Sequence, residues 1–418
     1  MPMASESAPV AARPRATRLI IPGIALVLLA IGIASWDPGY RRWALLGVVL
    51  YGFPLACCIF RSTMIRVWGL WFGVFLVVQT AISLFVPQLP NDYITLPPNT
   101  HLRVDIEATN LPGLSGIHTY STDEQGYRVA PRIDYARADA LRIFAIGGST
   151  TECTVLDDTA TWSYLLQEGL VAALGKSVQV VNTGVSGLRA RNHLATLRHV
   201  LDLHPSAVIF LVGANDWERQ IRKHFATIPL WVEKVRLRQT LLGLALLRIV
   251  EGTVAPIGRP VDRDEVIVDN GDHLRPLQHS LDRPEKRRFT PSVIDPDYTG
   301  YLESISTLCH ERNLPCIFVT QPTAHSPDAS PEMRATFWMT PPYTSYTLPI
   351  EDMAHIAALY NHFLVDFARK HNDPVCDLAS ALAPTVDNFY DDFHFNQSGA
   401  RNVAKYLVPC VAAALAAR

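Results

Sequence analysis

The sequence has few charged residues, and their signs nearly balance. Only 18% of the 418 residues are charged, and the formal net charge is −2. A typical soluble protein carries about 25% charged residues, and nucleic-acid-binding proteins usually show a strong basic excess. The sequence therefore excludes a nucleic-acid-binding function. Hydrophobic residues make up 49% of the chain, which excludes a long disordered protein, and the length predicts about two to three domains.

Two common metal-binding patterns are also missing. The 14 histidines form no His-Glu-x-x-His motif, so a zinc hydrolase of that type has no support. The seven cysteines form no Cys-x-x-Cys pair, and Cys57 and Cys58 lie in an apolar stretch. Cys309 and Cys316 are the nearest pair among the others, but sequence alone assigns no disulfide. We expect neither a metal ion nor a cofactor.

The apolar residues are concentrated at the start of the chain. Three windows there carry no charge, and each has close to the ~20 residues that a helix needs to cross a bilayer. They are Leu19–Trp36, Trp43–Phe60 and Val67–Pro87. A signal peptide followed by core helices is the alternative, but no small-x-small cleavage site follows the first window. We expect three transmembrane helices within residues 19–87, after a cytoplasmic tail of residues 1–18.

The arginines near these windows predict the orientation, because positive residues in short loops usually stay in the cytoplasm. The tail and the second loop carry Arg13, Arg15, Arg18, Arg61 and Arg66. The first loop carries Arg41 and Arg42. We therefore expect the part of the chain after Pro87 to lie on the outer, periplasmic side of a bacterial cytoplasmic membrane.

Beyond a linker with irregular strands at residues 88–137, short apolar runs alternate with helical patterns. The runs predict strands at 141–146, 178–181, 207–212, 316–319 and 375–378. The patterns predict helices at 161–174, 191–203, 298–312, 350–371 and 397–416. Such alternation is typical of an α/β fold with a parallel sheet covered on both faces. We expect this domain at residues 138–418, with an insertion at about 217–297.

Polar segments follow four of the expected strands, where sites form in parallel sheets. They are Gly-Gly-Ser-Thr-Thr at 147–151, Asn-Thr-Gly-Val-Ser-Gly at 182–187, Gly-Ala-Asn-Asp at 213–216 and Asp-Asp-Phe-His at 391–394. Each alone has an ordinary interpretation. The first could hold a phosphate on its backbone N–H groups, although it lacks the lysine of a P-loop. The last could be a helix cap beside a surface histidine.

Together and in this order, the four segments resemble the SGNH (GDSL-type) hydrolase family, from about Asp139 to Leu415. The segment Asp123–Arg128 also resembles the lead-in of many bacterial members. Gly148 departs from the pattern, since it stands where the family often has the Asp of its GDS motif. That position is variable in the family and is not catalytic. The resemblance implies a three-layer α/β/α sandwich of the SGNH or flavodoxin-like type and an esterase activity.

The residues themselves agree with this chemistry. A serine hydroxyl is a weak nucleophile until a neighbouring base accepts its proton. We expect Ser149 to be the nucleophile and His394 to be the base. Asp391, three residues before His394, can orient the imidazole as the third member of a triad. Asp392 ranks second for that role, and Asp216 is expected to be structural.

The resemblance also implies an oxyanion hole. Its donors would be the backbone N–H groups of Ser149 and Gly187 and the side-chain amide of Asn215. Gly184 competes with Gly187 for the second position. Such donors matter because the loss of one costs about 10²–10³ in rate.

Residues that follow strand ends can also contact a substrate. Arg189, Trp217 and Gln321 are weaker candidates for this, with a purely structural role as the alternative. The apolar stretch at 241–247, behind several basic residues, predicts either a helix packed on the domain or an interfacial lid.

We expect a membrane-anchored serine esterase that cleaves O-acyl esters. Acetyl groups on cell-surface glycans or lipids are one candidate substrate class. The expected partners are an acylated small molecule, glycan or lipid and the membrane, but no nucleic acid. The alternatives are an O-acyltransferase with the same triad and a non-catalytic membrane-tethered binding module.

Overall fold

The structure, a computed structural model, describes residues 52, 57, 62–85, 92–128, 133–137, 139–226, 266–268 and 275–416. The chain divides into two units, residues 1–88 with 229–254 and residues 89–228 with 255–418. The first apolar window lies outside the described residues, and so does the second apart from Gly52 and Cys57. The apolar stretch at 241–247 also lies outside them.

In the first unit, helix α3 (Thr63–Phe85) covers most of the third apolar window. Several of its large apolar side chains are exposed, among them Trp68, Leu70 and Trp71. In the part of the chain that the structure describes, no helix is long and apolar enough to cross a membrane. The transmembrane helix expected in this window is therefore not supported by the structure.

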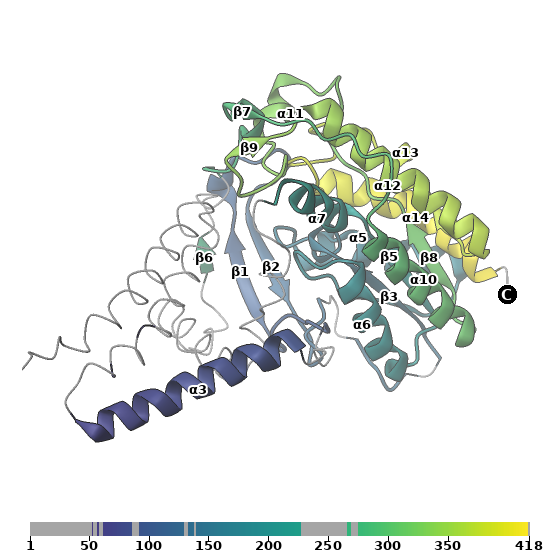
Figure 1. Ribbon diagram of the computed structural model, residues 1–418. Helices are drawn as coiled ribbons and strands as arrows, with labels where there is room; N and C mark the ends of the chain where they lie inside the picture. Colours follow the sequence, from purple (N-terminus) through teal and green to yellow (C-terminus); the bar gives the residue numbers. More distant parts are fainter. Residues whose placement is uncertain are drawn as a thin grey trace, which may run out of the picture. The chain divides into compact units, whose positions relative to one another are not determined.

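The second unit is built on a parallel sheet of five strands in the order β10-β8-β5-β3-β4 (Figure 1). The strands are β3 (Leu141–Gly147), β4 (Val178–Asn182), β5 (Ala207–Leu211), β8 (Cys316–Val319) and β10 (Val375–Cys376). In the register of the sheet, Ile143 of β3 lies between Val180 and Ala207. Chain order 2-1-3-4-5 is the flavodoxin-like arrangement, whose direction reverses at the first strand, here β3. The parallel-sheet α/β fold expected from the sequence is confirmed.

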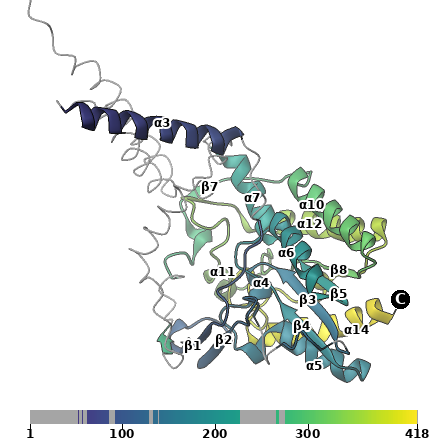
Figure 2. The same ribbon diagram turned by 90° about the horizontal axis from the view of Figure 1, so that it is seen from below.

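Alternate residues of each strand face opposite sides of the sheet, and each side has its own core. On one side, Ile143 and Ile209 pack with side chains of α5 (Trp162–Leu174) and α14 (Gln397–Ala416). On the other, Phe144 and Phe210 pack with α6 (Ala190–Val200), α7 (Ala214–Phe225), α10 (Pro296–Glu311) and α12 (Ile350–His371). Figure 2 shows the sheet between these two helical layers.

Local sequence signals explain where several helices begin and end. The Thr161 hydroxyl accepts a hydrogen bond from the Tyr164 N–H and so caps α5, which ends at Gly175 in the left-handed conformation. Helix α10 begins with a proline behind the capping side chain of Asp295. These signals place both helices within two residues of their predicted starts.

Smaller elements complete the unit. A three-stranded sheet in the order β2-β1-β6 contains β1 (His101–Asp105), β2 (Ile117–Ser121) and β6 (Val266–Val268). A two-stranded sheet pairs β7 (Glu285–Lys286) with β9 (Tyr346–Thr347). The short helices are α4 (Ser149–Glu152), α11 (Pro331–Ala335) and α13 (Leu378–Ala381). Among the described residues, 3-10 turns lie at 107–109, 158–160, 201–203 and 280–282.

Two disulfides tie helices to the sheet. Cys309 at the end of α10 is bonded to Cys316 at the start of β8. Cys376 of β10 is bonded to Cys410 of α14. Among the described residues, Cys57 and Cys153 are free and buried.

Candidate active site

Ser149 lies at the turn that follows β3, the strand at which the sheet order reverses. It is the first residue of the short helix α4 and is half-buried. The turn is too tight for a side chain at Gly147, because an added Cβ atom would lie 2.1 Å from the Thr151 hydroxyl oxygen and 2.8 Å from the Leu211 carbonyl oxygen. Gly147 thus lets the chain leave the sheet sharply and present the Ser149 hydroxyl beyond the strand end.

The structure brings together the three side chains that the sequence analysis assigned to a triad. His394 Nε2 lies 2.7 Å from Ser149 Oγ, across 245 residues of sequence. His394 Nδ1 lies 2.7 Å from Asp391 Oδ2 and 3.0 Å from Asp391 Oδ1. The backbone N–H of His394 also donates to Asp391 Oδ1. The spacing of three residues lets one carboxylate hold both the backbone and the ring of His394.

These contacts fix the tautomer of His394. An ionised carboxylate has no proton to donate, so Nδ1 carries the hydrogen in its bond with Asp391. In the neutral ring, Nε2 then has a free lone pair directed at Ser149 Oγ. This is the arrangement in which an imidazole can accept the proton of a serine hydroxyl.

The ionisation of the pair follows from burial and charge. Burial lowers the pKa of His394, but the charge of Asp391 and its hydrogen bond outweigh burial and raise this pKa above 6.5. Burial raises the pKa of Asp391, but His394 and the hydrogen bonds from Trp338 and the backbone outweigh it and leave this pKa lowered from 3.8. Asp391 is therefore ionised when His394 titrates.

Trp338 is a neighbour of this pair that the sequence analysis did not single out. Its indole Nε1 donates to Asp391 Oδ2 over 2.8 Å. Its ring is nearly parallel to that of His394, with an interplanar angle of 12° and 6.2 Å between centroids. Nothing in the local sequence signals this contact, because it joins residues that are 53 positions apart.

Asn215 follows β5, and its side chain is close to the Ser149 turn. Its Nδ2 donates to the Leu188 carbonyl over 2.8 Å, which leaves the second amide hydrogen for another acceptor. An added Cβ atom on Gly148 would lie 2.6 Å from this nitrogen. Loops after three strands, β3, β4 and β5, therefore meet at Gly148, Leu188 and Asn215.

The two competing glycines differ in their surroundings. The Gly184 N–H donates to Asn182 Oδ1, and an added Cβ atom there would lie 2.3 Å from the Glu152 nitrogen. Gly187 has a φ of +79°, and an added Cβ atom would meet nothing within 4 Å. Within the described residues, the backbone N–H groups of Gly187 and Ser149 donate to no other protein group. Gly184 thus serves close packing, and Gly187 keeps a free donor.

Glu152 supports this region and was not singled out from the sequence. Its carboxylate accepts hydrogen bonds from the Ser186 N–H, the Ser186 hydroxyl and the Tyr120 hydroxyl. It is buried, and it holds the residue directly before Gly187. Its only sequence signal is its place at the end of the helical turn that starts at Ser149.

The weaker candidates are placed differently from one another. Arg189 is half-buried at the start of α6. Trp217 is 1% exposed, with its ring packed on Tyr360 and Phe393. Gln321 is also 1% exposed, and its Oε1 accepts a hydrogen bond from the Thr150 hydroxyl. Burial leaves Trp217 without an exposed surface for a substrate, whereas Gln321 borders a small cavity.

The two neighbouring aspartates have contacts of their own. Asp216 accepts the Ala190 N–H and so joins α7 to α6, which is the structural role expected for it. Asp392 does not contact His394 through its carboxylate, and its Oδ2 instead accepts the Met339 N–H over 2.8 Å. Of the two candidate acids, Asp391 is the one bonded to the imidazole.

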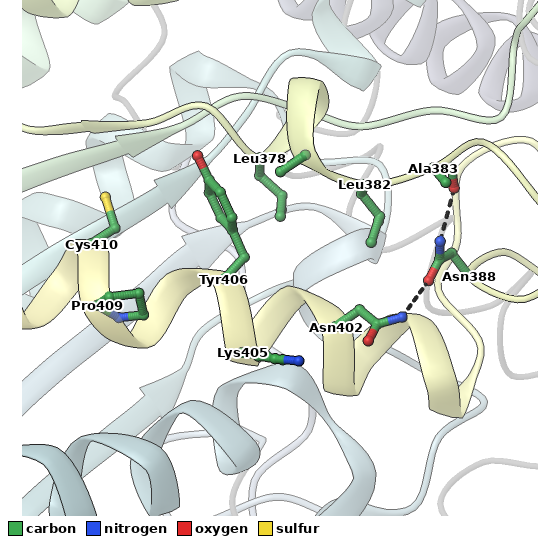
Figure 3. A pocket seen from close by; sticks show the side chains of 10 residues that line it. Leu378, Leu382, Ala383, Asn388, Asn402, Lys405, Tyr406, Pro409 and Cys410 are labelled. Carbon is green, nitrogen blue, oxygen red and sulfur yellow. Dashed lines mark hydrogen bonds between the residues drawn. The ribbon is translucent and has the colours of Figure 1, made fainter.

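A cavity of about 630 Å³ lies away from these residues, between α13 and α14 (Figure 3). Its lining includes Leu378, Leu382, Lys405 and Tyr406. A smaller one of about 260 Å³ is lined by Gln321, His325 and residues of α12. Neither contains Ser149 or His394. Among the described residues, no group of three or more His, Cys, Asp or Glu side chains could hold a metal ion.

Comparison with protein families identifies a family that contains these segments. The GDSL-like Lipase/Acylhydrolase family matches residues 145–401, well over half of the chain. The protein belongs to this family. Its membership makes it an ester hydrolase, and the four strand-end segments of the acylhydrolase domain lie inside the matched range.

Solved structures similar to this chain include other esterases. One is a catalytic mutant of Axe2, an acetylxylan esterase from Geobacillus stearothermophilus, with 15% identity, a TM-score of 0.34 and coverage of 65% of this chain and 93% of that chain. A lipase/acylhydrolase from Enterococcus faecalis has 19% identity, a TM-score of 0.35 and coverage of 65% and 95%. TesA has 13% identity, a TM-score of 0.38 and coverage of 65% and 97%. A comparison with curated proteins found no match.

Proposed function

We propose that this acylhydrolase cleaves O-acyl esters through a triad of Ser149, His394 and Asp391. The observation that carries the proposal is the unbroken chain of short contacts, 2.7 Å from Ser149 Oγ to His394 Nε2 and 2.7 Å from His394 Nδ1 to Asp391 Oδ2. In the neutral tautomer of His394, the proton of Ser149 has an acceptor within hydrogen-bond distance.

The first half of the reaction forms an acyl-enzyme. Ser149 Oγ attacks the carbonyl carbon of the ester while His394 Nε2 takes the hydroxyl proton. The tetrahedral intermediate collapses, the bond to the alcohol oxygen breaks, and His394 returns the proton to that oxygen. In the second half, His394 takes a proton from water, the resulting hydroxide attacks the acyl carbon, and Ser149 recovers its proton as the acid leaves.

Three donors are available for the negative oxygen of the intermediate. They are the Ser149 N–H, the Gly187 N–H and the second amide hydrogen of Asn215. The support for Gly187 over Gly184 is that the Gly184 N–H is already bonded to Asn182. Donors fixed before the reaction stabilise the developing charge without reorganisation in the site.

The test is hydrolysis of p-nitrophenyl esters of rising acyl length, together with labelling by a fluorophosphonate. We expect turnover and labelling in the wild type, and loss of both in Ser149→Ala. The control is Ser186→Ala, since Ser186 is also a hydroxyl of the site but contacts Glu152 rather than His394. Full turnover in Ser149→Ala, or no labelling of the wild type, would refute the proposal.

The acceptor of the acyl group separates a hydrolase from an acyltransferase. The proposed natural substrates are O-acylated glycans or lipids of the cell surface, with acetyl as the acyl group. Release of acetate from acetylated saccharides supports hydrolysis. Transfer of the acetyl group to an added saccharide, at a higher rate than the release of acetate, would instead assign the triad to acyl transfer.

We also propose that this domain works on the outer side of the cytoplasmic membrane, attached by the N-terminal segment. The support from the sequence is three uncharged windows and the distribution of arginines around them. A second support is the pair of disulfides, Cys309–Cys316 and Cys376–Cys410. Structural disulfides are typical of proteins in oxidising compartments such as the bacterial periplasm.

Reporter fusions in a bacterial host test this location. Alkaline phosphatase, which is active only after export, is fused after Arg418 or after Arg66. We expect activity for the first fusion and none for the second, because Arg66 directly precedes the third apolar window, on the side expected in the cytoplasm. The opposite pattern, or two active fusions, would contradict the proposed orientation.

A further inference from the structure

A second histidine–aspartate pair lies buried beside the candidate triad. The side chains of His325 and Asp392 are both 0% exposed, and His325 Nε2 lies 3.2 Å from Asp392 Oδ2. The imidazole of His325 makes edge contacts with Phe337 and Phe393, each with ring centroids 5.1 Å apart. Asp392 adjoins Asp391 in sequence and lies two residues before His394. The sequence analysis considered Asp392 only as a second candidate acid, and it did not consider His325.

The Thr323 hydroxyl contacts both members of this pair. It lies 2.8 Å from the Asp392 carbonyl oxygen, which can only accept. The same hydroxyl oxygen lies 2.7 Å from His325 Nδ1. With the hydroxyl hydrogen on the carbonyl, Nδ1 carries a hydrogen and donates it to Thr323. With the hydroxyl turned to Nδ1 instead, the carbonyl still accepts the Ala324 N–H.

The other ring nitrogen then faces an acceptor. If Nδ1 is protonated and the ring were neutral, the lone pair of Nε2 would face the Asp392 carboxylate, which is repulsive. A hydrogen must therefore lie between Nε2 and Oδ2. In the arrangement with hydrogens at both ring nitrogens, His325 and Asp392 together carry a net charge of zero, and the proposal below is built on this arrangement.

The net charge of this pair affects the pKa of the candidate base, His394. The charged and titratable groups that act on His394 are Asp391, Asp392 and Glu152, and all three are acidic. Asp391 is bonded to the ring, and Glu152 is held by Ser186 and Tyr120. Arg283 also interacts electrostatically with Asp392, and its guanidinium donates to the Pro341 and Tyr346 carbonyls.

We propose that His325 is a positioning residue that cancels the charge of Asp392 and so sets the proton affinity of His394. The inference rests on the proposed function, since it assigns His394 as the base. The pair also fixes the backbone of the catalytic segment, because the Asp392 carbonyl accepts the Ala324 N–H over 2.9 Å. Asp392 Oδ1 has no hydrogen-bond partner among the described residues, so this carboxylate is compensated at Oδ2, by the His325 imidazole and the Met339 N–H.

The test compares the pH dependence of His325→Gln, Asp392→Asn and the double variant. Glutamine can donate to Asp392 but carries no charge, so a negative charge remains beside His394. We expect the acid limb of kcat/KM, and of fluorophosphonate labelling at Ser149, to move up by about one pH unit. Asp392→Asn leaves no such charge, so its limb stays at or below the wild-type position.

The double variant separates charge from packing. It has lost both native groups but has no buried carboxylate at position 392. We therefore expect the acid limb of its kcat/KM profile at the wild-type pH, and a higher Tm than that of His325→Gln. A merely structural role predicts that the double variant is at least as impaired as the single one. The matched control is His193→Gln, because His193 is also buried, and burial lowers its pKa to about 3, so that it is neutral throughout.

The outcomes are distinct. An unshifted limb in His325→Gln, or a double variant no closer to wild type in limb position or Tm, overturns this proposal. Failure of the proposed function is recognised separately, because then the wild type itself shows no labelling at Ser149 and no ester turnover. A His193→Gln variant that shifts the limb as His325→Gln does would also overturn the role assigned to His325.

Discussion

The amide nitrogen of Asn215 occupies the space that a side chain on Gly148 would need. The distance from this nitrogen to an added Cβ atom is 2.6 Å, well inside van der Waals contact. Gly148 is the position where the sequence departs from the GDS pattern, so the departure and the placement of Asn215 are physically linked. In this protein, a side chain at position 148 is incompatible with the observed Asn215.

Gly148→Ala is therefore expected to lower activity by displacing a candidate oxyanion donor. The loss of one such donor costs about 10²–10³ in kcat. KM should change much less, since the donor acts on the intermediate. The measurement is kcat and KM on a p-nitrophenyl ester. Gly300→Ala in α10 is the control, because its added Cβ atom meets nothing within 4 Å. Unchanged kcat in Gly148→Ala would show that Asn215 does not act from this position.

Activity should fall at acidic pH with a midpoint above 6.5. The base must be neutral to accept the Ser149 proton, and the Asp391 charge raises the pKa of His394 above 6.5. Asp391→Asn removes that charge, so the midpoint should move to lower pH while kcat falls by about 10³–10⁴. The measurement is kcat/KM from pH 4 to 9. A midpoint that moves up in Asp391→Asn would contradict the ion pair.

Trp338→Phe is expected to weaken the hold on Asp391 while retaining an aromatic ring. The lost bond is the 2.8 Å contact from indole Nε1 to Asp391 Oδ2. A hydrogen bond to a charged group contributes about 1.5–3 kcal/mol, so kcat/KM should fall by about tenfold or more. Phe289→Leu serves as a control, since Phe289 contacts His224 and Phe225 rather than the triad or His325. Equal losses in both variants would indicate a general packing effect.

The two disulfides are expected to differ in their contribution to stability. Cys376–Cys410 closes a separation of 34 residues, whereas Cys309–Cys316 closes one of only 7. In the chain-entropy description, the longer loop stabilises by about 1.4 kcal/mol more. Urea unfolding of the paired serine variants measures this difference. A larger loss for the Cys309–Cys316 pair would show that packing, rather than loop closure, dominates.

Asp216→Asn should stabilise the fold, and more at high pH than at low pH. Burial raises the pKa of Asp216 to about 7 from 3.8 in a free chain, despite the opposing hydrogen bond from Ala190. As pH rises through this range, the unfolded chain ionises first, so the native state loses stability. The gain from asparagine should be of the order of 2–4 kcal/mol at pH 8 and small at pH 4. A gain of equal size at both pH values would contradict this.

Patterns within a single segment were enough to predict most of the sheet and its helices. Strand β8 lies at its predicted position because it is a short apolar run. Helices α12 and α14 do so because their apolar residues recur at helical spacing, and α12 also has a clear end at Asn372. Ser149, Asn215 and Asp391 could be named because the polar segments that contain them, taken together and in order, resemble those of the SGNH (GDSL-type) hydrolase family. Their catalytic roles stay predictions.

Contacts between distant segments could not be predicted in this way. Trp338 with Asp391 and His325 with Asp392 join loops with no periodic pattern, separated by 53 and 67 residues. The substrate-facing role assigned to Trp217 depended on its place after a strand, and the helical turn of α7 instead directs it into the core. A position just after a strand does not by itself determine whether a side chain faces the site or the core.

The distance between Ser149 and His394 along the chain has a consequence for biosynthesis. At ~5–20 residues per second, the 245 residues between them take roughly 12–50 s to synthesise. Throughout that interval Ser149 has no base at its side, and its hydroxyl is no more reactive than that of an ordinary alcohol. The segment from 391 to 394 arrives just ahead of α14, which packs on α5 and is bonded through Cys410 to the sheet. Under the proposed mechanism, the nascent protein therefore cannot attack the esters of its own cell before the domain has closed.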